Sequence, residues 1–140
     1  MSRYILDTDH VTLFQHNNSK IIQRARTVGS SNIFVTIITL EEQLRGRLAG
    51  ISRAATKPEQ FPVAYHNLRR TLVYFCSVNL LDFDDEAYNC YQNLRQQKIR
   101  IGTQDLKIAA IAIANRTILV TRNQQDFSKV PDLALLDWTE

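Results

Sequence analysis

The stretch Gly102–Phe127, GTQDLKIAAIAIANRTILVTRNQQDF, decides how the rest of the chain is arranged. Its apolar residues first recur at helical spacing, and a turn at Asn115 and Arg116 then leads into a β-branched run. The pattern predicts a helix that feeds a buried strand. A helix packed antiparallel to the strand that follows it has its start beside the end of that strand. We therefore expect Asp105, at the helix start, and Asp126, after the strand, to be neighbours.

The composition indicates one globular domain that spans residues 1–140. Hydrophobic residues make up 44% of the chain and charged residues 22%, with only three prolines and four glycines. No apolar run approaches the roughly 20 residues that a bilayer span requires, and no signal segment precedes the first strand. We expect a cytoplasmic protein without a membrane anchor, in which Cys76 and Cys90 are buried free thiols.

Charge is unevenly distributed. The formal net charge is +3, and the segment from Gln43 to Gln104 holds nine Lys or Arg against five acids. This excess favours an anionic partner only weakly, because scattered basic residues usually form a solvated face. Arginines that could contact phosphates in this segment are Arg45, Arg47, Arg69 and Arg70.

Strands and helices alternate along the whole chain, which predicts a three-layer α/β fold with a mainly parallel central sheet. Strands are expected at Arg3–Asp7, Asn32–Thr39, Val78–Phe83, within the opening stretch, and at the closing LALLDW as an edge strand. Helices are expected after Asp9, at Ser19–Thr27, from Thr39 through Ile51, at Phe61–Phe75, from Asp84 to about Lys98, and after Gly102. Thr8 or Asp9 is predicted to cap the first helix, and Thr39 to cap the third, with Glu42 closing a capping box.

In such a fold, the ends of the strands and the starts of the helices share one edge of the sheet, where ligands bind. Asp7 ends the first strand, Glu42 opens the helix after the second, and Asp105 and Asp126 flank the fourth. Four of the fourteen carboxylates, from distant parts of the chain, are thus expected at one edge.

Carboxylates so close together repel one another, and a cation normally holds such a cluster. The histidines, His10, His16 and His66, have no partner at metal-binding spacing, so the expected ligands are oxygen atoms alone. Oxygen ligands select hard ions, Mg²⁺ or Mn²⁺. The implied chemistry is metal-assisted hydrolysis of a phosphodiester bond.

Four segments resemble successive motifs of the PIN-domain ribonucleases, and most of all the VapC toxins of bacterial toxin–antitoxin pairs. They are ILDTD (5–9), TIITLEEQLRG (36–46), IGTQDLKIAAIA (101–112) and LVTRNQQDF (119–127). LALLDW is similar to the usual ending of that family, whereas Leu48–Arg100 matches only in pattern.

The resemblance implies an endoribonuclease that depends on Mg²⁺ or Mn²⁺, is often a homodimer, and is inhibited by a cognate VapB-like antitoxin. It places the metal-binding acids at Asp7 and Asp105, and Glu42 and Asp126 complete an acidic quartet. Thr121 and Asn123 would support the quartet by hydrogen bonding to carboxylates or RNA.

Two positions depart from the pattern of the family or require a choice. Asp9 stands where the family commonly has asparagine, so it either adds a fifth carboxylate or caps the helix. Glu41 precedes Glu42, and we assign the quartet to Glu42 because its spacing to Gly46 is that of the family.

Other interpretations of the same residues remain open. Each acid alone could be a helix cap, a dipole partner or a turn residue. The sequence YILDTDHVT also resembles the D-x-D opening of haloacid-dehalogenase-like phosphohydrolases, with Asp7 as nucleophile and Asp9 as general acid. That family needs a lysine and a further acidic motif after a later strand, and only nineteen residues follow Thr121. A third possibility is a PIN-like module that binds RNA or protein without cutting.

Overall fold

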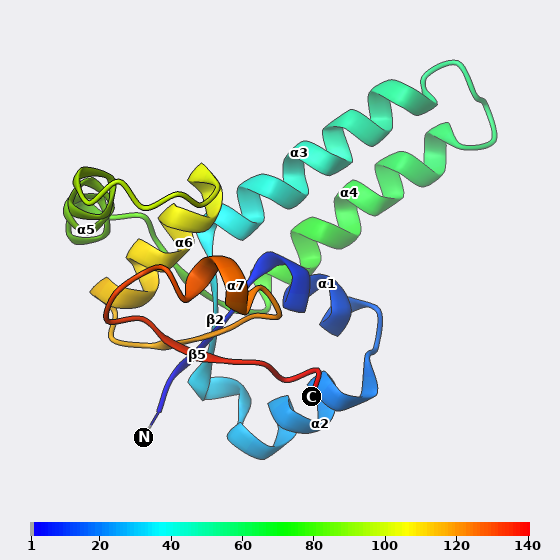
Figure 1. Ribbon diagram of the computed structural model, residues 1–140. Coiled ribbons are helices and arrows are strands. Elements are labelled where there is room, and N and C mark those ends of the chain that lie inside the picture. The colour runs from blue at the N-terminus through cyan, green and yellow to red at the C-terminus, as the bar shows by residue number, and fades with distance from the viewer. Residues whose placement is uncertain (1) are drawn as a thin grey trace.

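One five-stranded sheet forms the centre of the structure, a computed structural model that describes residues 2–140 (Figure 1). Its strands are β1 (Tyr4–Leu6), β2 (Ile33–Thr36), β3 (Asn79–Leu81), β4 (Ile118–Val120) and β5 (Ala134–Leu136). They lie in the order β3-β2-β1-β4-β5, and every neighbouring pair is parallel. The predicted edge position of LALLDW is confirmed, and the sheet is parallel throughout.

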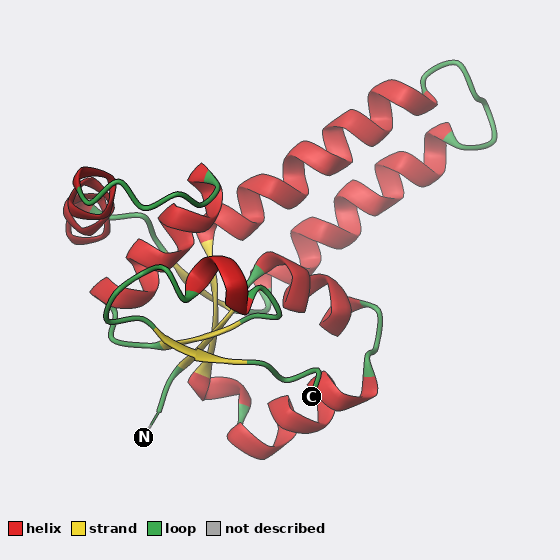
Figure 2. Ribbon diagram, in the orientation of Figure 1, coloured by secondary structure: helices red, strands yellow, loops and turns green. Residues whose placement is uncertain are grey.

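Helices cover both faces of the sheet, which confirms the three-layer α/β fold (Figure 2). They are α1 (Thr8–Gln15), α2 (Ser19–Val28), α3 (Ile37–Ala54), α4 (Phe61–Cys76), α5 (Asp85–Gln96), α6 (Thr103–Ala114) and α7 (Gln124–Phe127), with a 3₁₀ turn at Ser30–Asn32. Ile5 and Leu119 pack with α5 and α6, whereas Leu6 and Val120 pack with α1, α2 and α4. Successive strand residues thus point to opposite faces, and each face has its own core.

The helices α3 and α4 lie side by side and project from the sheet as a long hairpin (Figure 1). The apolar side chains of α4 are only partly covered, because Phe75 is 6% exposed whereas Leu72 is 59% exposed. Other large apolar side chains that the hairpin leaves exposed are Leu48, Val63, Tyr65 and Val73. The hairpin therefore offers an apolar surface to a partner.

The second strand is shorter than predicted, and the reason is a helix cap. The Thr36 hydroxyl accepts a hydrogen bond from the Thr39 amide at 3.2 Å, so α3 begins at Ile37. The β-branched residues after Thr36 lie in the first helical turn, because local capping outweighs their preference for strand. The prediction that Thr39 caps α3 and that Glu42 closes a capping box is therefore wrong.

The cap of the first helix also differs from the prediction. Asp7, rather than Thr8 or Asp9, is the N-cap of α1, and its carboxylate accepts from the His10 amide at 2.8 Å. The cysteines are free as predicted, but Cys76 is exposed and Cys90 is only half-buried, so the prediction that both are buried is wrong. Within residues 2–140, no helix is both long and apolar enough to cross a membrane.

Burial predicts very different costs for shortening two leucines of neighbouring strands. Leu119→Ala removes a side chain that is 0% exposed and should lower the free energy of unfolding by about 2–5 kcal/mol, because it leaves a cavity. Leu136→Ala, on the edge strand and 42% exposed in the wild type, is the matched control and should cost well under half as much. Urea denaturation measures both free energies of unfolding. Equal losses would contradict the burial of Leu119 and the exposure of Leu136.

Candidate functional site

The predicted acids lie at the edge of the sheet where β1 and β4 end. Asp7 follows β1, and its amide donates to the Val120 carbonyl of β4 at 3.1 Å. From β1 the chain passes to β2 on one side, and it later returns to β4 on the other side. Such a reversal of strand order is where ligands bind in parallel α/β sheets. The edge next to Asp7 is thus the expected place for a site.

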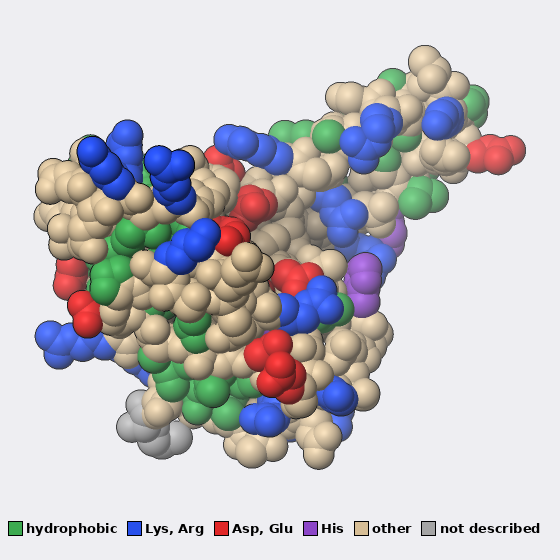
Figure 3. Space-filling model, viewed as in Figure 1, with side chains coloured by type: hydrophobic (Ala, Val, Ile, Leu, Met, Phe, Trp, Pro, Cys, Tyr) green, Lys and Arg blue, Asp and Glu red, His purple; other side chains and the backbone are tan. Residues whose placement is uncertain are grey.

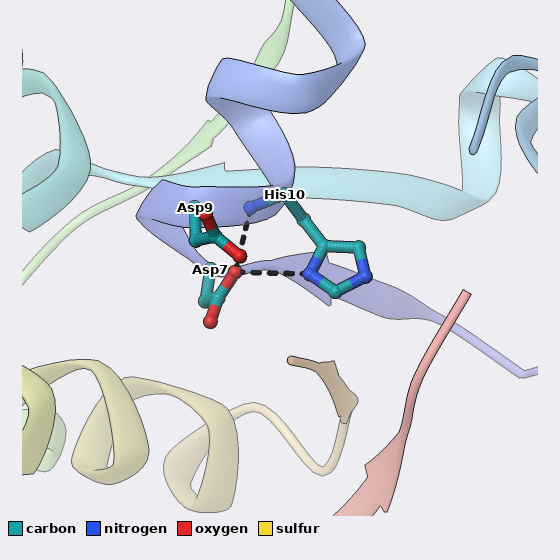
Figure 4. A group of neighbouring side chains, drawn as sticks. All are labelled: Asp7, Asp9 and His10. Atoms are coloured by element: carbon teal, nitrogen blue, oxygen red, sulfur yellow. Dashed lines mark hydrogen bonds and ion pairs between the residues drawn. The ribbon is translucent and has the colours of Figure 1, made fainter. Parts of the chain in front are cut away.

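Asp7 is buried, with 6% of its surface exposed. Its Oδ1 accepts two hydrogen bonds, one from the His10 amide at 2.8 Å and one from the His10 ring nitrogen Nδ1 at 3.2 Å (Figure 4). Within residues 2–140, no hydrogen bond reaches the second oxygen, Oδ2, which points away from the imidazole in Figure 4. One oxygen is therefore fixed by the protein and the other is available to a ligand.

Asp105 lies in the first turn of α6 and is the electrostatic centre of the cluster. Its pKa is raised above the usual value, first by burial and then by the negative charges of Glu42, Asp7 and Asp126. These three acids come from α3, the end of β1 and α7. In the described part of the chain, no Lys or Arg forms an ion pair with Asp105. The structure thus brings all four predicted acids together and leaves Asp105 without a counter-ion.

Glu42 and Asp126 are each held by a neighbouring side chain. The Thr8 hydroxyl donates to Glu42 Oε1 at 2.8 Å and so links α1 to α3. The Asn123 amide group donates to Asp126 Oδ2 at 3.1 Å, and Lys129 Nζ lies 3.5 Å from Asp126 Oδ1. Hydrogen bonds therefore position these two acids around Asp105.

Thr121 and Asn123 shape the loop after β4. The buried Thr121 hydroxyl accepts from the Asn123 amide at 2.9 Å, and the Asn123 side chain caps the short helix α7. Asn123 thus touches a carboxylate directly, whereas Thr121 acts on the backbone that presents Asn123.

Asp9 neither caps α1 nor stands free. Arg122 forms a bidentate pair with it, at 2.6 Å from Nε to Oδ2 and 2.9 Å from Nη2 to Oδ1. The pair raises the pKa of the Arg122 guanidinium, chiefly through the hydrogen bond to Asp9. An arginine therefore compensates the acid that stands where the family commonly has asparagine.

The two adjacent glutamates, Glu41 and Glu42, have different partners, which bears on which of them belongs to the quartet. Glu41 accepts from Gln104 Nε2 at 2.9 Å and from Arg45 Nη2 at 2.8 Å. The Gln104 hydrogen bond is the main cause of its lowered pKa, to which Arg45 and Lys107 also contribute. Glu41 is thus compensated by its neighbours, whereas the charge of Glu42 acts on Asp105.

His10 belongs to the site, although sequence reasoning treated it as an ordinary polar residue. Its side chain is fully buried, and its ligand atoms lie within 4.8 Å of those of Asp7 and Asp9. Its contact with Asp7 could have been predicted from the spacing of three residues, because residues three apart are neighbours on the surface of a helix.

The surface near the foot of the hairpin is rich in acidic side chains (Figure 3). Acidic side chains gather where the α3–α4 hairpin leaves the sheet, and basic side chains are scattered along the hairpin (Figure 3). A separate hollow of about 440 Å³ lies between α3 and α4, and Arg47, Arg53 and Lys57 are among its lining residues. That hollow contains none of the four acids, so we assign the chemistry to the acidic edge.

The donor set fits a hard divalent cation. Among the described residues, none donates a hydrogen bond to Asp7 Oδ2 and no Lys or Arg pairs with Asp105, and every acid of the quartet offers oxygen atoms. Mg²⁺ and Mn²⁺ are bound by such carboxylate oxygens, usually with water completing the shell. Asp7 and Asp105 are accordingly the candidate ligands.

Comparison with known proteins points to one family. The family model for the PIN domain matches residues 4–133. Ribonuclease VapC1 of Haemophilus influenzae is 26% identical over 145 residues, which cover 98% of each chain. The structure of VapBC-1 from nontypeable Haemophilus influenzae superposes with a TM-score of 0.74 at 26% identity, covering 98% of each chain. The DNA-bound VapBC of Salmonella typhimurium has a TM-score of 0.79, covering 99% of each chain, and at 22% identity it supports the fold alone.

Repulsion around Asp105 predicts a variant that gains stability. The folded-state pKa of Asp105 lies above its unfolded value, so the wild type loses stability as pH rises from the unfolded pKa through the folded one. Asp105→Asn removes this loss and should be more stable than wild type at neutral pH without divalent cations. The two proteins should converge below the unfolded pKa, near pH 3.8.

Urea denaturation at a series of pH values, in the presence of a chelator, measures this difference. Asp132→Asn, at the exposed opposite edge of the sheet, is the matched control and should leave the pH dependence as in wild type. An Asp105→Asn protein that is less stable than wild type at neutral pH would show that the cluster is not repulsive.

Proposed function

Since this chain belongs to the PIN domain family, we propose that it is a metal-dependent endoribonuclease and the toxin of a VapBC-type toxin–antitoxin pair. The observation that carries the proposal is the convergence of Glu42, Asp7 and Asp126 on the half-buried Asp105. The relatives named ribonuclease VapC, of which one is 26% identical along almost the whole chain, support the same activity.

The proposed roles follow from the geometry. Asp7 and Asp105 would hold the Mg²⁺ or Mn²⁺ ion, and Asp7 would offer Oδ2, the oxygen that no hydrogen bond reaches within residues 2–140. A divalent cation at this place supplies Lewis-acid chemistry, which offsets charge on the phosphate and favours ionisation of an attacking water. Glu42 and Asp126 would accept hydrogen bonds from an attacking water and so orient it toward the scissile bond.

Supporting residues keep these acids in place. Asn123 holds the Asp126 carboxylate, and Thr121 fixes the turn that carries Asn123. Asp9 holds Arg122 at the same edge of the sheet, where its guanidinium can meet an RNA phosphate.

A phosphohydrolase with Asp7 as nucleophile is less consistent with this geometry. Its general acid would be Asp9, but both Asp9 oxygens are occupied by Arg122. A binding module without catalysis would have no reason to gather repelling carboxylates around Asp105. A metal-dependent nuclease is consistent with both the Asp9–Arg122 pair and the carboxylates gathered around Asp105.

The proposed partners are an RNA substrate, a VapB-like antitoxin and a second copy of the chain in a homodimer. Exposed apolar side chains on the α3–α4 hairpin, such as Leu72 and Val73, provide a surface for the protein partners. Residues 1–140 are proposed to act as a single PIN domain, and an RNA substrate implies a cytoplasmic location.

The nuclease proposal predicts RNA cleavage by the purified protein, free of antitoxin, when Mg²⁺ or Mn²⁺ is present. Asp7→Asn and Asp105→Asn should each lower the cleavage rate by about a hundredfold or more, because each removes a metal ligand. A chelator should have the same effect on the wild type. Gel analysis of a labelled RNA measures the rate.

Asp132→Asn again serves as the matched control, because it removes one carboxylate at the opposite edge of the sheet. It should cleave RNA at the wild-type rate. Residual activity that is equal in the wild-type, Asp7→Asn and Asp105→Asn preparations would point to a contaminating nuclease and refute the proposal.

A further inference from the structure

His10 is a fully buried imidazole for which the proposed function has no role. It lies in α1 beside an apolar core that includes Val11 and Trp138. Burying a polar ring there is costly unless both nitrogens have partners, and both do. Nδ1 lies 3.2 Å from Asp7 Oδ1, and Nε2 lies 3.4 Å from the backbone nitrogen of Trp138.

These two contacts determine which ring nitrogen carries the hydrogen. The Trp138 amide can only donate, so Nε2 must accept. In the neutral ring the hydrogen is then on Nδ1, which donates to Asp7 Oδ1. Asp137 Oδ1 lies 3.6 Å from Nε2, beyond hydrogen-bond distance, and is engaged by Thr139. The geometry thus specifies one tautomer.

The residues around Trp138 hold the imidazole at Nε2, on the side of the ring away from Asp7. Asp137 Oδ1 accepts from the Thr139 amide at 2.8 Å and from its hydroxyl at 2.6 Å, which forms a tight turn around Trp138. The Trp138 ring is buried and packs on Tyr4 of β1, with ring centroids 5.5 Å apart. The Trp138 amide is therefore a rigid anchor for the ring of His10.

The same ring sets the orientation of Asp7. Two donors, the His10 amide and Nδ1, converge on Oδ1 and prevent the carboxylate from rotating. Rotation would exchange the two oxygens or change the direction in which Oδ2 points. A ligand carboxylate held in this way loses less conformational freedom when it binds a metal.

We propose that His10 is a positioning residue, whose Nδ1 donor to Asp7 Oδ1 orients Asp7 Oδ2 toward the divalent cation, while the Trp138 amide selects the tautomer that carries this hydrogen. The inference rests on the proposed function, because it assumes that Asp7 is a metal ligand. It adds that a buried residue that does not touch the metal contributes to metal affinity through its hydrogen bond to Asp7.

Three substitutions separate this role from simple filling of the core. The amide of Asn reaches about as far as Nδ1, and that of Gln about as far as Nε2. His10→Asn thus retains a donor to Asp7 but loses Trp138, His10→Gln retains Trp138 but loses the donor, and His10→Leu loses both. All three disturb the core. Only those that lose the donor should disturb the metal site.

Titration calorimetry with Mn²⁺ at constant pH measures the dissociation constant of each protein. His10→Gln and His10→Leu should weaken binding by about 10- to 100-fold, the usual cost of losing a partner that orients a ligand. His10→Asn should restore most of this affinity, to within about threefold of wild type. Thr117→Val, which removes a buried hydrogen bond to the Ala112 carbonyl at the opposite end of β4, controls for lost stability and should bind Mn²⁺ normally.

Equal weakening in all three His10 variants, or none, would overturn the inference. A nitrogen-15 NMR spectrum of the wild-type imidazole gives an independent check that needs no variant, because it reports which nitrogen is protonated. A hydrogen on Nε2 with Nδ1 bare would also overturn it. If Asp105→Asn abolishes Mn²⁺ binding and His10→Gln leaves it intact, only this inference fails. A wild-type protein that binds no Mn²⁺ refutes the metal site of the proposed function as well.

Discussion

Electrostatic repulsion among the carboxylates around Asp105 is the constraint on which the other features of this molecule depend. Four acids from α1, α3, α6 and α7 or their caps share one edge of the sheet, and burial raises the pKa of Asp105 among them. A fold selected for stability alone would not place them together. The hydrogen bonds to Asp7, Glu42 and Asp126 hold the acids in a geometry that repulsion would otherwise disperse. The cation of the proposed function would relieve this repulsion, which would favour its binding.

The parallel sheet makes that arrangement possible at low cost to the backbone. Because β1 and β4 are adjacent and end at the same level, the residues that follow them meet without a long loop. Two helix N-caps also contribute to the acidic site. Asp7 caps α1 and offers an oxygen to the site, and Asn123 caps α7 and holds Asp126. Structural and functional explanations of these residues are therefore not alternatives.

Sequence reasoning located the sheet, its edge strand and the four acids, because each depends on periodicity and on the shared edge of parallel strands. It failed where a local hydrogen bond competes with propensity. The Thr36 cap turned residues 37–39 from strand into helix, and Asp7 took the capping role expected of Thr8 or Asp9. It also missed His10, because the decisive partner, the Trp138 amide, lies 128 residues away in the chain. The exposure of Leu72 and Cys76 depends on how far the hairpin stands away from the sheet, which no local pattern encodes.

The α3 helix runs from the edge of the sheet, where the acids lie, to the turn at the tip of the hairpin (Figure 1). Its 18 residues correspond to a rod of about 27 Å, with Glu42 near one end and the hairpin turn at the other. Helical hydrogen bonds make such a rod stiff along its axis, so a displacement at the turn is carried to its base. Glu42 and an exposed apolar side chain of the hairpin, Leu48, thus lie on one stiff helix. The outer part of the hairpin, where apolar side chains are exposed, and the acid Glu42 near its base are therefore parts of the same helix.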